Sequence, residues 1–141
     1  MADDCLFCGI VDGEMPSHTV YETDDVMAFL DVNPLSRGHT LVIPKRHAAG
    51  VGDLPDVEGR ALFEAVHDIA DDVADAVGAD GYNLGLNNGE AAGQEIDHVH
   101  FHVVPRRHGD GGGPIHAIMP GQQEAEDDEL AAVADDVRDA L

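Results

Sequence analysis

Three histidines alternate with apolar residues in one short run of the chain, His98-Val99-His100-Phe101-His102-Val103-Val104. Successive side chains of a β-strand point to opposite faces of its sheet, so we expect the three imidazoles on one face and the apolar side chains in the core. An imidazole face is costly to bury without polar partners. The run therefore predicts a strand that carries a functional site, in preference to a merely solvated polar face.

Two chemistries suit such a strand. Alternating histidines can ligate one zinc ion and leave a position open for water, as in metallohydrolases. Alternatively, an imidazole can attack phosphorus and form a covalent intermediate that water then hydrolyses. The preceding loop, Asn87 to Gln94, is rich in glycine and small residues and offers backbone N–H groups suited to phosphate oxygens. Its position directly before the histidine strand favours phosphoryl or nucleotidyl transfer.

The remaining pattern predicts an α+β protein with an antiparallel sheet, one long helix and a C-terminal helix. Apolar residues recur at helical spacing from Asp56 onward, and Gly78 is a plausible end of this helix. The acidic segment Glu124 to Leu141 shows helical spacing again. The expected strands are short runs bounded by turn signals or proline: residues 20–22, 26–30, 40–43, 82–86 and 98–104.

The charge of the chain is extreme for its size. Its 141 residues carry a formal net charge of −22, and Lys45 is the single lysine. The acids are spread among apolar positions, which favours adaptation to molar intracellular salt, where self-repulsion is screened, over an acidic partner-binding face. We predict a halophilic source. This charge also argues against DNA or RNA as a partner.

Five of the seven basic residues fall within the segments 37–46 and 106–107. They suggest an anionic ligand near the histidine run, although pairing of each with a nearby acid is an equal alternative. No run of eighteen apolar residues and no apolar leader segment is visible, so we predict a cytoplasmic protein without a membrane partner.

Cys5 and Cys8 form a Cys-x-x-Cys pair. A structural disulfide is not expected in a cytoplasmic chain, and this spacing suits a zinc knuckle that takes two further ligands from elsewhere. Reduced thiols in the core and a redox pair are the alternatives.

These motifs together resemble the histidine triad (HIT) family, in its Hint-like branch. Residues 92–106 resemble the histidine triad signature, and the segments 5–17, 28–34 and 38–47 also match. The resemblance covers about residues 5–107, whereas the segment 108–141 matches poorly. We therefore expect residues 1–141 to form a single HIT domain, and the resemblance implies a homodimer that binds adenosine or other purine nucleotides.

The resemblance also implies roles for particular residues. His100 would be the nucleophile on the α-phosphate, with His98 and His102 as the other members of the triad. His102 would bind a phosphate oxygen. The phosphate site would also include Asn87, Gly93 and Gln94.

Asp31 would accept hydrogen bonds from the ribose hydroxyls, with Phe29 and Val32 near the base. A carboxylate is a natural acceptor for a cis-diol, and the alternative is that Asp31 is a turn residue before Asn33-Pro34. Glu95 departs from the family pattern, in which many members carry Ser or Thr on the side of the leaving group. A carboxylate there would repel phosphate if it pointed inward, so it either points outward or acts on a cationic or amine leaving group.

Zinc-bearing members of the family imply a ligand set of Cys5, Cys8, His47 and His98. Such a set closes a structural site, in which His98 and His47 orient the histidine segment and relay no protons. The sequence thus predicts a phosphoramidase-like hydrolase or transferase that forms a nucleotidyl-histidine. The alternatives are a dinucleoside polyphosphate hydrolase, a zinc-stabilised nucleotide-binding module with little turnover, and a metallohydrolase.

Overall fold

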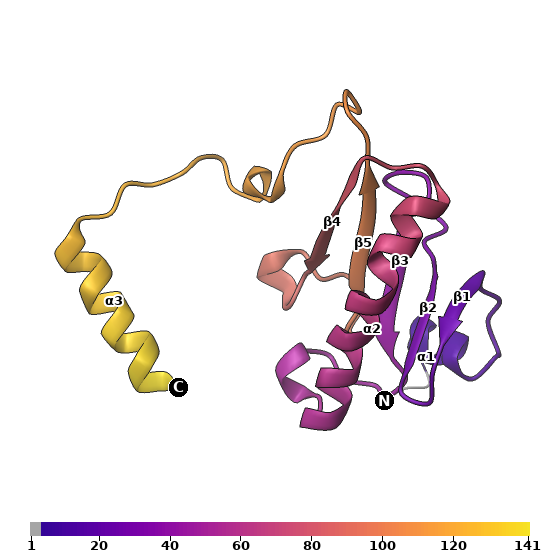
Figure 1. The fold of residues 1–141 in the computed structure, drawn as a ribbon. Helices are drawn as coiled ribbons and strands as arrows, with labels where there is room; N and C mark the ends of the chain where they lie inside the picture. Colours follow the sequence, from indigo (N-terminus) through magenta and orange to yellow (C-terminus); the bar gives the residue numbers. More distant parts are fainter. Residues whose placement is uncertain (1–3) are drawn as a thin grey trace. The chain divides into compact units, whose positions relative to one another are not determined.

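The computed structural model describes residues 4–141 and divides the chain into two compact units (Figure 1). The first unit ends at Asp110 and contains the whole sheet, and the second runs from Gly111 to Leu141. Their boundary lies three residues beyond the end of the family resemblance. Residues 1–3, on which part of the localisation prediction rests, lie outside the described residues.

A five-stranded antiparallel sheet forms the centre of the first unit, with the strand order β1-β2-β3-β5-β4. This arrangement confirms the α+β class and the antiparallel sheet predicted from the sequence. Each expected strand exists, with ends that move by up to three residues. The strands are β1 (Thr19–Glu22), β2 (Val26–Leu30), β3 (Thr40–Pro44), β4 (Gly81–Leu86) and β5 (Phe101–Arg106).

The long helix α2 (Asp56–Ala76) lies across one face of this sheet (Figure 1). Its buried stripe, which includes Leu62, Val66 and Ile69, packs with β-strand residues in the main core cluster. The helix ends where Gly78 adopts a positive φ of 67°, as its sequence predicts. The Arg107 guanidinium donates hydrogen bonds to the last carbonyls of this helix end, at Val77 and Gly78.

A short helix on the N-terminal side of the chain, α1 (Leu6–Val11), was not predicted. Six residues give less than two turns, too few for a periodic signal. Phe7 and Ile10 of α1 join a second core cluster with residues of β2 and β3. The structure also contains the 3-10 helices η2 (Val51–Asp53), η3 (Glu90–Ala92) and η4 (Ile115–Ile118).

The histidine run enters the sheet later than predicted, because β5 begins at Phe101. His98 to His100 precede the ladder, and the Val99 N–H donates to the Ala48 carbonyl over 2.8 Å. The strand also continues through Pro105, which was expected to stop it. β5 pairs with β3 only as far as Val103, and beyond that point it pairs with β4 alone. Pro105 therefore lies where no β3 residue needs a hydrogen bond from its missing N–H.

The C-terminal unit carries η4 and the helix α3 (Asp127–Ala140). This helix begins three residues after the predicted start at Glu124. Leu130, Val133 and Val137 of α3 are each more than half exposed. Within the described residues, no helix is both long and apolar enough to cross a membrane.

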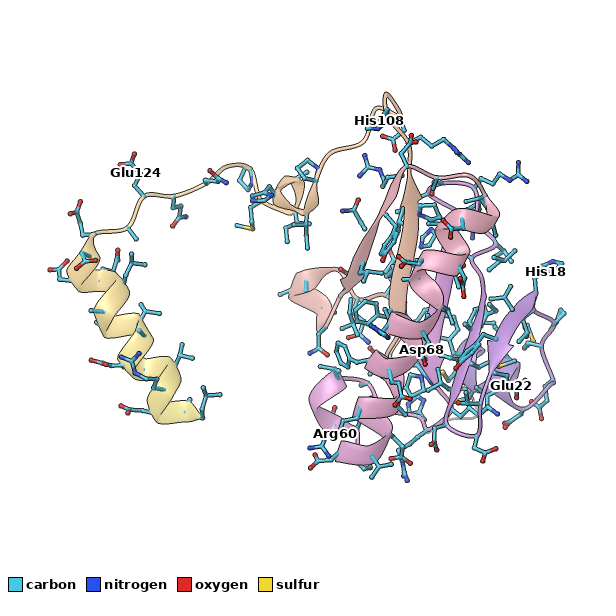
Figure 2. The ribbon with its side chains drawn as sticks, in the orientation of Figure 1. His18, Glu22, Arg60, Asp68, His108 and Glu124 are labelled. Carbon is cyan, nitrogen blue, oxygen red and sulfur yellow. The ribbon has the colours of Figure 1, made fainter. Side chains whose placement is uncertain are left out.

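Acidic side chains are distributed over the elements of both units (Figure 2). Glu22 on β1 and Asp68 on α2 are 49% and 44% exposed, and Glu124 belongs to the exposed segment before α3. Glu22, Asp68 and Glu124 thus lie on three different segments of the chain.

Candidate functional site: a thiol–imidazole cluster and an adjoining histidine pocket

The histidine segment joins two clusters of polar side chains. His98 is completely buried and lies with the two cysteines, whereas His100 and His102 line a cavity of about 630 Å³. The Phe7 ring contacts both His98 and His100 edge-on, with centroid separations of 5.9 and 5.2 Å. One apolar side chain from α1 thus separates two chemically different sites.

The thiol–imidazole cluster consists of Cys5, Cys8, His47 and His98, and one donor atom of each lies within 4.8 Å of the others. Cys5 is the N-cap of α1, and its Sγ accepts the Cys8 N–H, so one helical turn brings both thiols to the same place. His47 follows β3 and contributes Nδ1, which lies 3.2 Å from Cys8 Sγ.

The orientation of His98 suits a metal ligand. Its Nε2 lies 2.8 Å from the Pro44 carbonyl, an acceptor, so Nε2 carries the proton and Nδ1 holds the free lone pair. That Nδ1 lies 3.5 Å from each of the Cys5 and Cys8 sulfurs. Tetrahedral zinc, with its ordinary Zn–S and Zn–N lengths, would separate sulfur and nitrogen ligands by about 3.5 Å. Donor types, spacing and tautomer therefore fit a closed zinc site.

Burial shapes the protonation of this cluster. Desolvation, followed by the hydrogen bond with Cys5, raises the pKa of the Cys8 thiol to about 11. Desolvation also lowers the pKa of His98, which keeps this imidazole neutral and available as a ligand. A bound zinc ion would reverse the shift of the thiol, because a coordinating cysteine is deprotonated.

The pocket has an apolar wall and a polar loop. Its wall combines α1 with the adjoining strands, and its polar lining includes Asp31 after β2, the loop after β4 and the histidine run. The predicted nucleotide residues that line it are Phe29, Asp31, Val32, Asn87, Gly93, Glu95, His100 and His102.

His100 presents its Nε2 to this pocket. Its Nδ1 lies 2.8 Å from the His98 carbonyl oxygen, which can only accept, so Nδ1 carries the proton. Nε2 therefore keeps the lone pair that an attack on phosphorus needs. His100 is 8% exposed, so the ring is held in place by its surroundings yet remains accessible from the cavity.

A chain of hydrogen bonds orients His102. The Leu35 N–H donates to His39 Nδ1 over 3.0 Å, so His39 carries its proton on Nε2. That Nε2–H donates to His102 Nδ1 over 2.9 Å, which leaves His102 with Nε2–H as a donor. Desolvation, and then repulsion from His100, lower the pKa of His102 to about 4. His102 is thus a neutral donor near neutral pH.

Asp31, His39 and His102 form a second group with the donor types of a metal site. The proton on His39 Nε2 decides against a metal there, because the Leu35 N–H already occupies the other nitrogen. Among the described residues, no candidate metal cluster contains all three triad histidines. The geometry therefore does not favour the metallohydrolase alternative.

Gln94 lies outside the lining of the pocket. Its side-chain carbonyl accepts the Gly89 N–H, and its amide donates to the carbonyls of Ala49 and Ile96. This arrangement gives Gln94 a visible part in shaping the loop. Gly93, with a φ of 98°, turns the loop close to the Asn87 side chain.

No role was predicted for His39 from the sequence. His39 is 2% exposed and contacts His102, while the other histidines left without a role, namely His18, His67, His108 and His116, are exposed. The pairing of Leu41 with His102 brings the start of β3 beside the triad. This strand register places His39 next to His102, and it cannot be derived from the sequence alone.

The comparisons with known proteins agree with this geometry. The model of the HIT domain family matches residues 12–109. The chain belongs to the HIT family. An uncharacterised HIT-like protein of Methanocaldococcus jannaschii is 49% identical over 107 residues, which cover 76% of this chain and 82% of the relative.

Two further HIT proteins bear on the chemistry. An adenosine 5′-monophosphoramidase of Schizosaccharomyces pombe is 40% identical over 132 residues and covers 91% of this chain and 96% of the relative. A zinc-bound histidine triad family protein from Mycobacterium smegmatis has a TM-score of 0.74 at 33% identity, with complete coverage of both chains. The chain is thus a HIT-family protein with hydrolase relatives.

Proposed function

We propose that this protein hydrolyses adenosine 5′-phosphoramidates, or closely related purine nucleotides, through a covalent nucleotidyl-histidine. The observation that carries the proposal is the opposite protonation of two neighbouring imidazoles. His100 offers a lone pair at Nε2, and His102 offers an N–H at Nε2. A nucleophile beside a neutral donor is the arrangement that attack on a phosphate ester or amide requires.

In the proposed reaction, the nucleotide lies with its base against the apolar wall near Phe29 and Val32. The Asp31 carboxylate accepts hydrogen bonds from the ribose hydroxyls. The α-phosphate faces His100, and its oxygens accept hydrogen bonds from His102 Nε2–H and from donors of the loop that includes Asn87 and Gly93. A base, sugar and phosphate thus each find chemically suitable groups.

The chemistry proceeds in two displacements. His100 Nε2 forms a bond to phosphorus, the phosphorus–nitrogen bond of the substrate breaks, and the departing amine takes a proton from solvent. A water oxygen then bonds to phosphorus, the bond to His100 breaks, and the water proton passes to solvent. The His98 carbonyl stabilises the positive ring that exists between the two steps, because it accepts the Nδ1–H.

We also propose that the thiol–imidazole cluster holds one structural zinc ion per chain. Cys5, Cys8, His47 and His98 would supply four ligands, and no position would remain open for substrate. The ion would supply stability, fixing α1 and the segment that carries His100. Metal analysis of protein purified without chelator should give close to one zinc per chain.

A two-fold homodimer in the cytoplasm of a halophilic organism completes the proposal. The strand β4 lies at the edge of the sheet, and Phe63 on α2 and Leu84 on β4 are 50% and 38% exposed. An edge strand with exposed apolar neighbours is suited to pairing with a second copy. Light scattering in high salt should give the mass of a dimer at micromolar concentration, and a monomer would contradict this part.

A panel of substrates tests the activity. We expect turnover of adenosine 5′-phosphoramidates with kcat/KM well above that for dinucleoside polyphosphates. The reverse order would favour the dinucleoside polyphosphate hydrolase. Tight nucleotide binding without turnover of either class would favour a zinc-stabilised binding module.

A further inference from the structure

The pocket proposed to hold an anionic nucleotide has an unusual charge. Among its described lining residues there is neither lysine nor arginine, and two of them, Asp31 and Glu95, are carboxylates. Proteins that bind several phosphates generally use cationic side chains to do so. Here His102 and the neutral donors near Asn87 are the groups that face the phosphate.

Four of the five basic residues near the histidine run are engaged elsewhere, and the fifth, Arg37, is exposed and is not among the residues that line the pocket. Arg106 pairs with Asp110 at 2.7 Å. Lys45 pairs with Glu22 at 2.7 Å, Arg46 with Glu58 at 2.9 Å, and Arg107 with the carbonyl end of α2. The anionic ligand suggested by these cations in the sequence therefore does not meet them in the pocket. The described lining of the pocket thus contains no lysine or arginine to pair with a second phosphate or a sulfate on the leaving group.

The carboxylates of Asp31 and Glu95 differ in their polar contacts within the protein. Asp31 Oδ1 accepts the Asn33 N–H over 2.9 Å, and Oδ2 lies 3.7 Å from His39 Nε2. Glu95 is exposed and lines the same cavity, and its carboxylate has no hydrogen bond or ion pair with any residue that the structure describes. It belongs to the loop that also carries Asn87 and Gly93.

We propose that Glu95 selects substrates whose leaving group is a cationic amine, that is, an amine bearing a second, protonated amino group. This inference rests on the proposed function and names its substrate class. The Glu95 carboxylate pairs with the distal ammonium while His100 displaces the nitrogen bonded to phosphorus. That nitrogen leaves as the free amine after taking a proton from solvent, and the distal ammonium stays protonated throughout.

The same carboxylate disfavours other leaving groups. A polyphosphate, a sulfate or a carboxylate on the departing side would bring like charges together in a pocket without a compensating lysine or arginine. Because Glu95 is exposed, the expected preference is moderate, about threefold to fivefold, as for ion pairs at a protein surface.

Three adenosine 5′-phosphoramidates of equal chain length test this proposal. Their leaving amines end in an ammonium, a hydroxyl or a carboxylate, and kcat/KM is measured for each at the lowest KCl concentration that keeps the protein folded, because salt screens an exposed ion pair. We expect wild type to prefer the ammonium over the hydroxyl by about threefold to fivefold and to disfavour the carboxylate. Glu95→Gln should bring the three values close together.

Glu90→Gln is the matched control, because Glu90 lies in the same loop, is exposed and does not line the cavity. It should keep the wild-type order. Equal kcat/KM for all three substrates in wild type, or an unchanged preference in Glu95→Gln, would overturn the inference and leave the proposed function standing. An equal loss of preference in Glu90→Gln would also overturn it. Failure to hydrolyse any of the three would remove the proposed function, and this inference with it.

Discussion

The histidine segment has two ends that differ in chemistry: His98 lies in the thiol–imidazole cluster, and His100 lines the pocket. The two imidazoles carry their proton on opposite ring nitrogens. At His98, the Pro44 carbonyl accepts a hydrogen bond from Nε2–H, and Nδ1 faces two sulfurs. At His100, the His98 carbonyl accepts a hydrogen bond from Nδ1–H, which leaves Nε2 as the free nitrogen of a ring that lines the pocket. A backbone acceptor on one ring nitrogen thus decides what the other nitrogen can do.

The surroundings of the two ends reinforce this difference. His98 is closed off by thiols, an aromatic ring and His47, whereas His100 and His102 border a cavity. A closed shell of ligands suits a structural ion, and an open face suits a substrate. The comparison predicts that damage at the first end affects mainly stability, and that damage at the second affects mainly turnover.

Removal of the nucleophile should have the largest effect. His100→Ala should reduce kcat by roughly 10⁴-fold or more, since the covalent step has no substitute, while the Kd for adenosine monophosphate changes little. Single-turnover kinetics and calorimetric titration measure the two quantities. Turnover close to that of wild type would show that the open end does not act through His100.

The opposite end should respond in stability. Cys8→Ser should lower zinc content and reduce the free energy of unfolding by about 3–5 kcal/mol, with a smaller loss of kcat at low temperature. Metal analysis and denaturant unfolding provide the measurements. A variant that keeps its stability but loses turnover would reverse the division between the two ends.

The link between His39 and His102 should have an intermediate effect. His39→Ala removes the donor to His102 Nδ1 and frees this ring to exchange tautomers, so we expect kcat to fall by about 10- to 100-fold. His39→Gln, whose amide can still donate, should recover part of the loss, with KM little changed in both. Equal activity of His39→Ala and wild type would show that the hydrogen bond from His39 to His102 does not contribute to turnover.

Acid should weaken the pocket end. Burial lowers the pKa of His39 and brings that of His102 to about 4, below the value of about 6.5 expected in the unfolded chain. The folded state therefore binds fewer protons, and stability present above pH 6.5 is lost as pH falls towards 4. Thermal melting in high salt should show this fall, and His102→Asn should make it shallower. A slope identical to that of wild type would contradict the shift.

Salt should stabilise both ends of the histidine segment alike, because it screens the repulsion that arises from the net charge of −22 and does not act on the histidines themselves. Melting temperature should rise from about 0.1 to 3 M KCl as self-repulsion is screened. The thiol–imidazole cluster and the pocket should be stabilised together in a single transition. A melting temperature independent of salt would remove the halophilic interpretation.

Local patterns in the sequence predicted the elements better than their junctions. Turn signals, proline and the alternating histidine run located every strand, and helical spacing of apolar residues located the helices α2 and α3. They missed α1, which has too few residues for a period, and they extended β5 back to His98, where hydrogen bonding to Ala48 replaces the ladder. The core of the fold was thus predictable from spacing, and its connections were not.

The candidate site shows the same limit. Residue types along one strand identified the triad and the cysteine pair, but the tautomers depend on carbonyls of Pro44 and His98 that only the folded backbone supplies. His39 depends on a strand register, and the role of Gln94 on three loop contacts. Pairings across the sheet and between loops lie beyond what local sequence patterns specify.

Covalent trapping of the intermediate shows directly whether His100 is the nucleophile. Wild-type protein is mixed with an adenosine phosphoramidate labelled at the α-phosphate, quenched within milliseconds and digested, and the attached label is located by mass spectrometry. We expect an acid-labile nucleotidyl group on His100, none on His98 or His102, and none in His100→Ala. Label on another histidine, or full turnover with no labelled protein and immediate arrest by a chelator, would contradict it.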